Sequence, residues 1–186
     1  YPDPVLVGMA IDAGADGVLV PYTENIEDVK KCSARAYNNP LKGEYLEKVM
    51  NEQKFPSEKS QKYLKERNKE RIFILGIESK PALENLENLI LSAPMDGIFV
   101  GPNDLTTSMG IPDELDNKKY IDALKKIIKI SENHNLPVMI HHATIELSHL
   151  SIELGSRFIL HGSDSSFLTN AIHQDFTNLK NKKNNL

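Results

Sequence analysis

The sequence predicts an α/β fold with parallel strands, because short apolar runs alternate along the chain with stretches of helical periodicity. The apolar runs are rich in Val, Ile, Leu and Phe at successive positions, a pattern typical of strands covered on both faces, as in a parallel sheet. Five such strands are predicted, at residues 17–20, 71–77, 97–100, 137–140 and 157–160.

Amphipathic stripes occupy the intervals between these strands. Apolar residues recur every three or four positions, which predicts helices over residues 26–36, 83–90, 120–128, 147–154 and 167–179. Two start signals agree with this assignment, since Ser79 precedes Pro81 and Asp116 precedes the helix that contains Tyr120.

The segment from about residue 38 to 70 differs in composition. It is rich in Lys and Glu, it is broken by Pro40 and Pro56, and it holds few apolar anchors. We expect it to form two exposed helices inserted between the first two strands of a single domain over residues 1–186. The Lys- and Asn-rich end, residues 180–186, is expected to be frayed or disordered.

Length and composition exclude several classes of protein. The chain has 186 residues, of which 40% are hydrophobic and 26% charged, with a net charge of −4. This is enough for one domain with a sizeable core, and it argues against a general nucleic-acid binder, which would carry a basic face. The chain opens on Tyr1 and not on Met, as expected of one that has been processed, tagged or trimmed.

The same residues bear on the compartment of the protein. The single cysteine, Cys32, rules out an internal disulfide, and no Cys/His cluster has the spacing of a structural zinc site. No apolar run approaches the roughly 18 residues that cross a bilayer, and the first residues lack the features of a signal peptide. We therefore expect a cytoplasmic protein with no membrane contact.

Polar side chains collect immediately after the predicted strands. In parallel α/β folds the carboxyl ends of the strands meet at one edge, where the βα loops bind ligands, so an active site is expected there. In chain order, the five strands are followed by Pro21-Tyr22-Thr23, Glu78-Ser79, Gly101-Pro102-Asn103-Asp104, His141-His142 and His161-Gly162-Ser163-Asp164.

Glu78 and Asp104 form the strongest pair in this set. Each follows an apolar strand directly, where an unpaired carboxylate would be costly, and two hard oxygen ligands suit Mg²⁺ or Mn²⁺. The alternative is a pair of helix-capping or salt-bridged carboxylates. The turn that begins at Gly101 lets backbone approach a ligand, and the N–H groups beyond it could hold a carboxylate.

The histidines give weaker signals. We expect at least one of His141 and His142 to face the site and neither to be a primary metal ligand. His134, His149 and His173 are expected to belong to the surface or to helix packing. Asp164 is a secondary candidate, although its serine-rich segment is most simply a helix N-cap. A nucleophilic role for Cys32 is not expected, because it lies on a predicted helix with no adjacent histidine and no cationic trap for a thiolate.

Several of these motifs together resemble the HpcH/HpaI aldolase family of the phosphoenolpyruvate/pyruvate-type barrels. They run in order from about Tyr1 to Leu168, and Lys42-Gly43-Glu44 and Ile140-His141-His142-Ala143-Thr144 resemble a less-characterised branch. The motifs are Ala10-Ile11-Asp12-Ala13-Gly14, GVLVP at 17–21, Ile77-Glu78-Ser79, GIFVGPNDL at 97–105, Ser108-Met109-Gly110 and Gly162-Ser163-Asp164.

The resemblance implies a (β/α)8 TIM barrel, of which this chain covers about strands 4–8. It also implies that Glu78 and Asp104 bind a divalent metal, Mg²⁺ or Mn²⁺, with Co²⁺ also suitable. The substrate carboxylate would lie on the backbone N–H groups of Asn103 and Asp104, in the turn with Gly101 and Pro102. The family's catalytic His and Arg would lie upstream of Tyr1, which leaves only His141 and Asp164 as weaker catalytic candidates here.

The implied function is that of a class II aldolase. Such a lyase cleaves 4-hydroxy-2-oxo acids to pyruvate, or a related 2-oxo acid, and an aldehyde through a metal-stabilised enolate. Two alternatives remain open: a citrate-synthase-like condensing enzyme and a non-catalytic remnant that binds metal and oxo acid. The family's usual Arg-Gly is Lys42-Gly43 here, which leaves the substrate preference open.

The expected partners are a small oxo acid and further copies of the chain. Barrels of this type often assemble, and the amphipathic last helix, residues 167–179, could pack across a subunit boundary.

Overall fold

A computed structural model describes residues 1–52 and 55–184. Its centre is a five-stranded parallel sheet in which the strands follow one another in chain order. The predicted α/β fold is therefore confirmed, and each predicted strand is present within two residues at either end. The strands are β1 (Gly17–Val20), β2 (Ile72–Ile77), β3 (Gly97–Val100), β4 (Val138–His142) and β5 (Phe158–His161).

Helices connect every pair of strands. The helices are α1 (Pro4–Asp12), α2 (Ile26–Tyr37), α3 (Gly43–Glu52), α4 (Glu58–Arg67), α5 (Lys80–Glu84), α6 (Leu86–Ser92), α7 (Pro102–Ser108), α8 (Lys118–Asn133), α9 (Ile145–Glu153) and α10 (Asp164–Asn184). The helix predicted over 83–90 is two helices that meet at Asn85. Helix α1, which begins where the Asp3 side chain accepts a hydrogen bond from the N–H of Val5, was not predicted.

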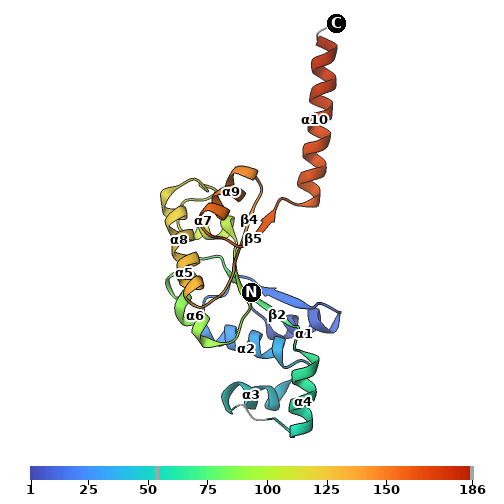
Figure 1. Ribbon diagram of the computed structural model, residues 1–186, viewed down its shortest axis with the longest axis vertical. Helices are drawn as coiled ribbons and strands as arrows, with labels where there is room; N and C mark the ends of the chain where they lie inside the picture. The colour runs from blue at the N-terminus through green and yellow to red at the C-terminus, as the bar shows by residue number, and fades with distance from the viewer. Residues whose placement is uncertain (53–54, 185–186) are drawn as a thin grey trace.

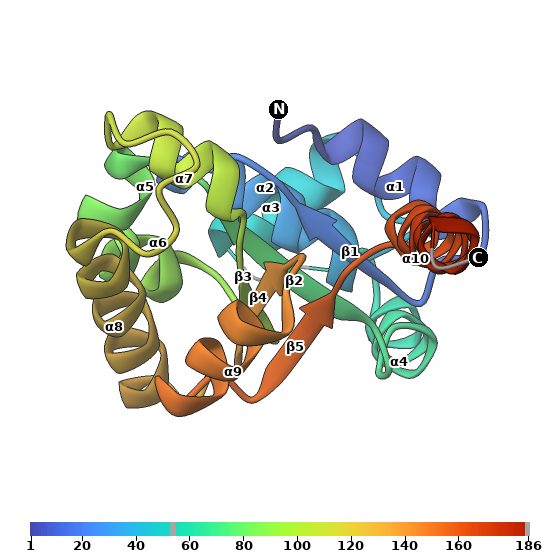
Figure 2. The same cartoon turned by 90° about the horizontal axis from the view of Figure 1, so that it is seen from above.

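The main core lies between the sheet and the helices on one side of it (Figure 2). Side chains that alternate along β2, β3 and β4 point into this layer, among them Leu75, Val100 and Ile140, and each is fully buried. They pack against the apolar stripes of α6 and α8. Each such side chain contributes roughly 1.5–3 kcal/mol of burial free energy, so this layer holds the strand ends in place.

The opposite face of the sheet is open in the described residues, so the expectation that both faces are covered is wrong for this part of the chain. Phe158 is 53% exposed, Ile72 46% and Leu160 41%. A cavity of about 370 Å³ lies on this face between Ile72, Gly97, Met139 and Phe158. The barrel that the resemblance implies would account for this open apolar face, because the inward face of a barrel is packed with apolar side chains. Runs of successive apolar residues therefore have a second possible cause.

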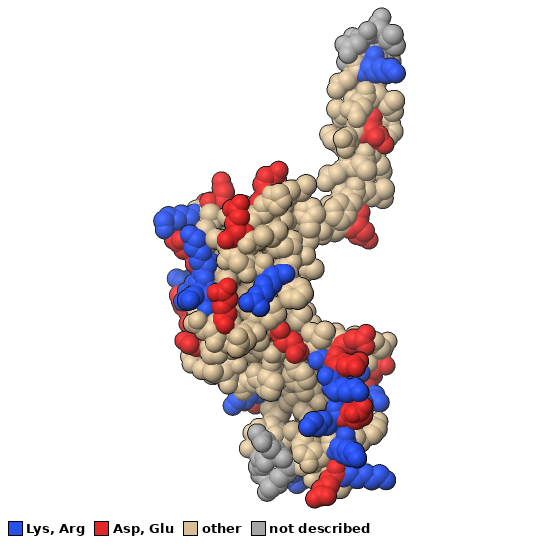
Figure 3. Space-filling view, viewed as in Figure 1, with Lys and Arg blue, Asp and Glu red and all other residues tan. Residues whose placement is uncertain are grey.

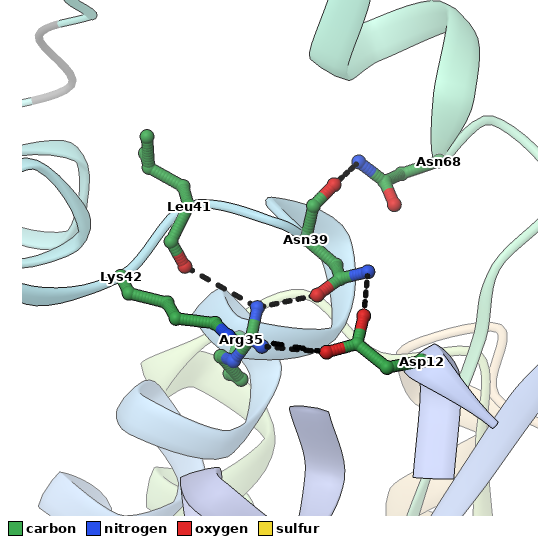
Figure 4. Close-up of polar contacts among 6 residues, drawn as sticks. All are labelled: Asp12, Arg35, Asn39, Leu41, Lys42 and Asn68. Atoms are coloured by element: carbon green, nitrogen blue, oxygen red, sulfur yellow. Dashed lines mark hydrogen bonds and ion pairs between the residues drawn. The ribbon is translucent and has the colours of Figure 1, made fainter. Parts of the chain in front are cut away.

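The charged insertion forms the two predicted helices, α3 and α4, and Figure 3 shows side chains of both signs gathered over α4. Figure 4 shows the polar contacts that hold the loop before α3 in place. Buried Arg35 donates to the side-chain oxygen of Asn39 (2.5 Å) and to the carbonyl of Leu41 (3.3 Å). Asn39 in turn donates to Asp12 and accepts from Asn68, so α1, α2 and α4 share one polar network.

Helix α10 projects away from the rest of the chain (Figure 1). The prediction that residues 180–186 are frayed is wrong as far as Asn184, where the helix ends; residues 185 and 186 lie outside the described part. Among the described residues, no helix combines the length and the apolar character that crossing a bilayer requires.

Candidate functional site

Glu78 follows β2 directly and is the centre of the candidate site. Its side chain is only 8% exposed, and one carboxylate oxygen, Oε2, accepts a hydrogen bond of 2.7 Å from the backbone N–H of Tyr22. Burial raises the pKa of Glu78, the Tyr22 N–H opposes this rise, and the negative charge of Asp104 adds to it. The hydrogen bond therefore holds the carboxylate in place, but it offsets only part of the cost of burying its negative charge.

Gly101 brings the turn after β3 against this carboxylate. A Cβ atom at position 101 would lie 2.5 Å from Oε1 of Glu78 and 2.9 Å from its Cγ, so only glycine leaves Glu78 where it is. The sequence predicted a glycine that lets backbone approach a ligand. The structure shows that the group it approaches is the Glu78 side chain.

Asp104 and Asn103 lie in the first turn of α7, on the same edge of the sheet. Both side chains are exposed, and Pro102 occupies the first helical position, for which its fixed φ is suited. The N–H groups of Asn103 and Asp104 precede the first intrahelical hydrogen bond, which runs from Leu105 to Gly101. This turn therefore presents one carboxylate and two backbone donors next to Glu78.

The loop between β1 and α2 closes the other side of Glu78, and its role was not predicted. Thr23 is fully buried and its N–H donates to the carbonyl of Gly76 (3.4 Å). Ser79, the N-cap of α5, donates to Glu24 of the same loop (2.6 Å). The motif Pro21-Tyr22-Thr23 was recognised as polar residues after a strand, but a backbone donor at Tyr22 leaves no signal in the sequence.

The donor chemistry at this edge fits a divalent cation. Glu78 and Asp104 could supply hard oxygen ligands, and the pKa of Glu78 is raised mainly by burial and further by the negative charge of Asp104. Within residues 1–52 and 55–184, no group of three or more His, Cys, Asp or Glu side chains is close enough to hold a metal ion. Two protein ligands leave open positions, which water or a chelating substrate would fill.

The two histidines that end β4 point to opposite faces. His142 is buried between Tyr120 (3.1 Å from Nε2) and Ser151 (2.9 Å from Nδ1) on the helix side. His141 is half-buried on the open side, and its Nε2 pairs with the carbonyl of Gly162 (3.0 Å). Strand alternation allows only His141 to belong to the open face, and a role for it in the site stays a prediction.

His142 gives a pH dependence of stability. Burial lowers the pKa of His142 below its ordinary value near 6.5. As the pH falls below 6.5, the unfolded chain therefore binds a proton at His142 before the folded chain does, which favours unfolding. We expect the free energy of unfolding to fall by up to about 1.4 kcal/mol per pH unit between pH 6.5 and the lowered pKa of His142. Urea unfolding at pH 7.5 and 5.5 measures this loss.

The control for this prediction is a pair of matched variants. His142→Gln should flatten the pH dependence, whereas exposed His149→Gln should leave it as in the unmodified chain. Equal slopes in all three proteins would mean that another group titrates.

Three other residues that the sequence analysis discussed lie away from Glu78. Asp164 is the exposed first residue of α10, where its carboxylate accepts from the N–H of Ser165 (2.7 Å). Lys42 pairs with Asp12 (3.9 Å) close before β1, at the edge of the sheet opposite to Glu78. Cys32 is fully buried, and burial raises the pKa of its thiol to about 12, which disfavours the thiolate.

The match to a family model and the names of similar proteins indicate the same family. Residues 3–171 match the family described as HpcH/HpaI aldolase/citrate lyase. A 4-hydroxy-2-oxo-heptane-1,7-dioate aldolase of Shigella flexneri is 27% identical over 175 residues, which are 91% of this chain. The match spans 63% of that relative's length.

Solved structures agree on the fold. An HpcH/HpaI aldolase/citrate lyase family protein from Burkholderia cenocepacia superposes with a TM-score of 0.80 at 22% identity, over 97% of this chain and 71% of that one. The citrate synthase SbnG superposes with a TM-score of 0.75 at 17% identity, over 96% of this chain and 68% of that one. Five successive βα units in one parallel sheet are the arrangement shared with these proteins.

Proposed function

Because the chain belongs to the HpcH/HpaI aldolase/citrate lyase family, we propose that the protein carrying it is a carbon–carbon lyase that cleaves 4-hydroxy-2-oxo acids. The observation that carries this proposal is the buried Glu78 carboxylate, which lies against Gly101 in the turn that presents Asp104. The name of the Shigella relative supports the substrate class. The aldehyde half of the substrate stays open.

Glu78 and Asp104 are the proposed ligands of a divalent cation, Mg²⁺ or Mn²⁺. When bound, the cation supplies positive charge next to the 2-oxo oxygen, on which negative charge develops as the carbon–carbon bond breaks. Tyr22 holds Glu78 ready for this role through its backbone N–H. Asp104 completes the protein's share of the ligands from the first turn of α7.

The substrate carboxylate is proposed to lie on the turn formed by Gly101, Pro102 and Asn103. The N–H groups of Asn103 and Asp104 have no intrahelical acceptor, and the partial positive charge of a helix N-terminus favours an anion. Binding here would orient the substrate so that its 2-oxo group faces Glu78. The negative charge of Asp104 lies on the same turn, which is a reason why a cation is needed for the carboxylate to bind.

The reaction requires a base as well as a sink for electrons. Cleavage removes the proton of the 4-hydroxyl group, breaks the bond between C3 and C4, and returns a proton to C3, so the products are pyruvate and an aldehyde. By the family resemblance, a catalytic His and an enolate-stabilising Arg would take these roles. Within this chain, His141 on the open face is the remaining weak candidate for a proton-transferring group.

The test is an assay of pyruvate release by the protein that carries this chain, with a panel of 4-hydroxy-2-oxo acids and Mn²⁺ or Mg²⁺. We expect pyruvate to form, EDTA to stop its formation, and added metal to restore it. Product formation that persists in EDTA would contradict the proposal. Metal and pyruvate binding without turnover of any substrate would favour the non-catalytic remnant instead.

We also propose that the protein is a homo-oligomer assembled through α10. This helix carries an apolar stripe of Leu168, Ile172, Phe176 and Leu179, each at least 49% exposed. It is the helix that follows β5, yet it does not pack back over β5 as a βα unit normally would. A second copy's α10 would fit that place, beside the exposed Ile152 of α9.

The area is sufficient for a stable dimer. Each stripe exposes roughly 400–500 Å² of apolar side chain, so a reciprocal exchange with matching receptor surfaces buries roughly 1,600–2,000 Å², within the range of stable specific interfaces. We expect light scattering to give a dimer or larger species, Ile172→Asp to give a monomer, and Gln174→Asp on the same helix to leave the assembly intact. A monomeric unmodified chain would contradict the proposal.

A further inference from the structure

Tyr22 lies at the candidate site in a backbone conformation that is rare for its residue type. Its φ is +51°, in the left-handed region that most residues other than glycine avoid. The only side-chain acceptor that its backbone N–H reaches in the described residues is Oε2 of Glu78, at 2.7 Å. Rare backbone conformations persist only where the surroundings impose them, and they cluster at functional sites.

The surroundings that impose this conformation come from β2. A Cβ atom at Gly76 would lie 2.9 Å from Cα of Pro21 and 3.0 Å from the carbonyl oxygen of Val20, so the loop crosses directly over Gly76. On the other side of Tyr22, the N–H of Thr23 donates to the carbonyl of Gly76, and Thr23 is fully buried. Tyr22 is therefore fixed between two anchored neighbours with its N–H turned to Glu78.

This contact distinguishes the two oxygens of the Glu78 carboxylate. Oε2 is occupied by the Tyr22 N–H, whereas Oε1 lies against Gly101, at the start of the turn that carries Asp104. A hydrogen bond to one carboxylate oxygen fixes the plane of the group and so the direction of the other oxygen. With Tyr22 in the left-handed conformation, Oε1 is the oxygen left to bind a cation.

We propose that Tyr22 is a positioning residue for the metal ligand Glu78 and acts through its left-handed backbone and not through its ring. This inference rests on the proposed function, because it takes Glu78 as a metal ligand. It predicts that the identity of residue 22 matters through tolerance of positive φ alone. Gly and Asn tolerate that region, whereas β-branched Val does not.

The test is the Mn²⁺ dissociation constant of four variants, measured from the free-ion signal in electron paramagnetic resonance. Tyr22→Phe, Tyr22→Gly and Tyr22→Asn should keep the constant within about twofold, and Tyr22→Val should raise it about tenfold or more, as is usual when the partner of a metal ligand is lost. Equal weakening by Gly, Asn and Val would assign the role to the ring and overturn the inference. Unchanged affinity in Tyr22→Val would also overturn it.

Two controls separate this effect from general strain and from failure of the metal site itself. Asn135 has a φ of +58° in the turn after α8, so Asn135→Val introduces the same backbone conflict far from Glu78 and should leave Mn²⁺ affinity unchanged. If Tyr22→Val does not fold, Tyr22→Ala against Tyr22→Gly gives the same comparison at smaller amplitude. If Glu78→Gln binds Mn²⁺ as the unmodified protein does, the proposed metal site fails, whatever Tyr22 shows.

Discussion

Glu78→Gln is expected to lower kcat/KM for cleavage of a 4-hydroxy-2-oxo acid about a thousandfold, equivalent to about 4 kcal/mol of transition-state free energy. The substitution keeps the size of the side chain but removes the charge that would hold the cation. It also leaves an amide between the Tyr22 N–H and Gly101, in a place shaped for a carboxylate. Initial rates of pyruvate release at saturating Mn²⁺ measure the loss.

The matched control is Glu84→Gln on the next helix. Glu84 is an exposed carboxylate whose ion pair with Lys80 (3.7 Å) lies on the surface of α5. The same chemical change there should leave the rate within about twofold, because surface ion pairs contribute little. Full metal-dependent activity in Glu78→Gln would remove Glu78 from the site.

Gly101→Ala is the second substitution with a large expected effect. The added methyl group would lie 2.5 Å from Oε1 and 3.0 Å from Cδ of Glu78, so the carboxylate must move away from the turn that carries Asp104. We expect the Mn²⁺ dissociation constant to rise at least tenfold and kcat/KM to fall about a hundredfold. Calorimetric titration with Mn²⁺ and the pyruvate assay measure the two effects.

This substitution acts through the side chain of Glu78 and not through the backbone. Gly101 has φ −90° and ψ 100°, which alanine adopts freely. Gly110→Ala reverses the situation, because Gly110 has a φ of +75° and open space around it. Gly110→Ala should therefore lower the free energy of unfolding by about 1 kcal/mol and leave the affinity for Mn²⁺ unchanged. An unchanged affinity in Gly101→Ala would contradict the proposed geometry.

The strands were predictable because each is a short apolar run bounded by glycine, proline or polar residues. Helix α1 was missed because its residues 4–11 are almost all apolar and show no periodic stripe, although Asp3 and Pro4 are a proper start signal. The apolar runs of the strands also led to the wrong prediction that both faces of the sheet are covered. Successive apolar residues are required both by a covered sheet and by the inner face of a barrel, so the open face around Phe158 carries no distinguishing pattern.

The site was predictable as a set of residue types and not as a geometry. Glu78 and Asp104 follow neighbouring strands, and parallel pairing of β2 with β3 places their strand ends together. Close approach at Gly101 was predicted, but its partner, the Glu78 side chain, was not. The N–H of Tyr22 could not be predicted, because a left-handed conformation at a tyrosine is imposed by packing against Gly76 and has no residue signature.

Anomalous diffraction at the manganese edge tests the proposed site most directly, with crystals grown in Mn²⁺ and pyruvate. We expect one strong peak per chain, about 2 Å from a carboxylate oxygen of Glu78 and from one of Asp104, with the pyruvate carboxylate against the N–H groups of Asn103 and Asp104. A peak bound to other residues, or none at Glu78 and Asp104 in crystals that hold pyruvate, would contradict the proposed site.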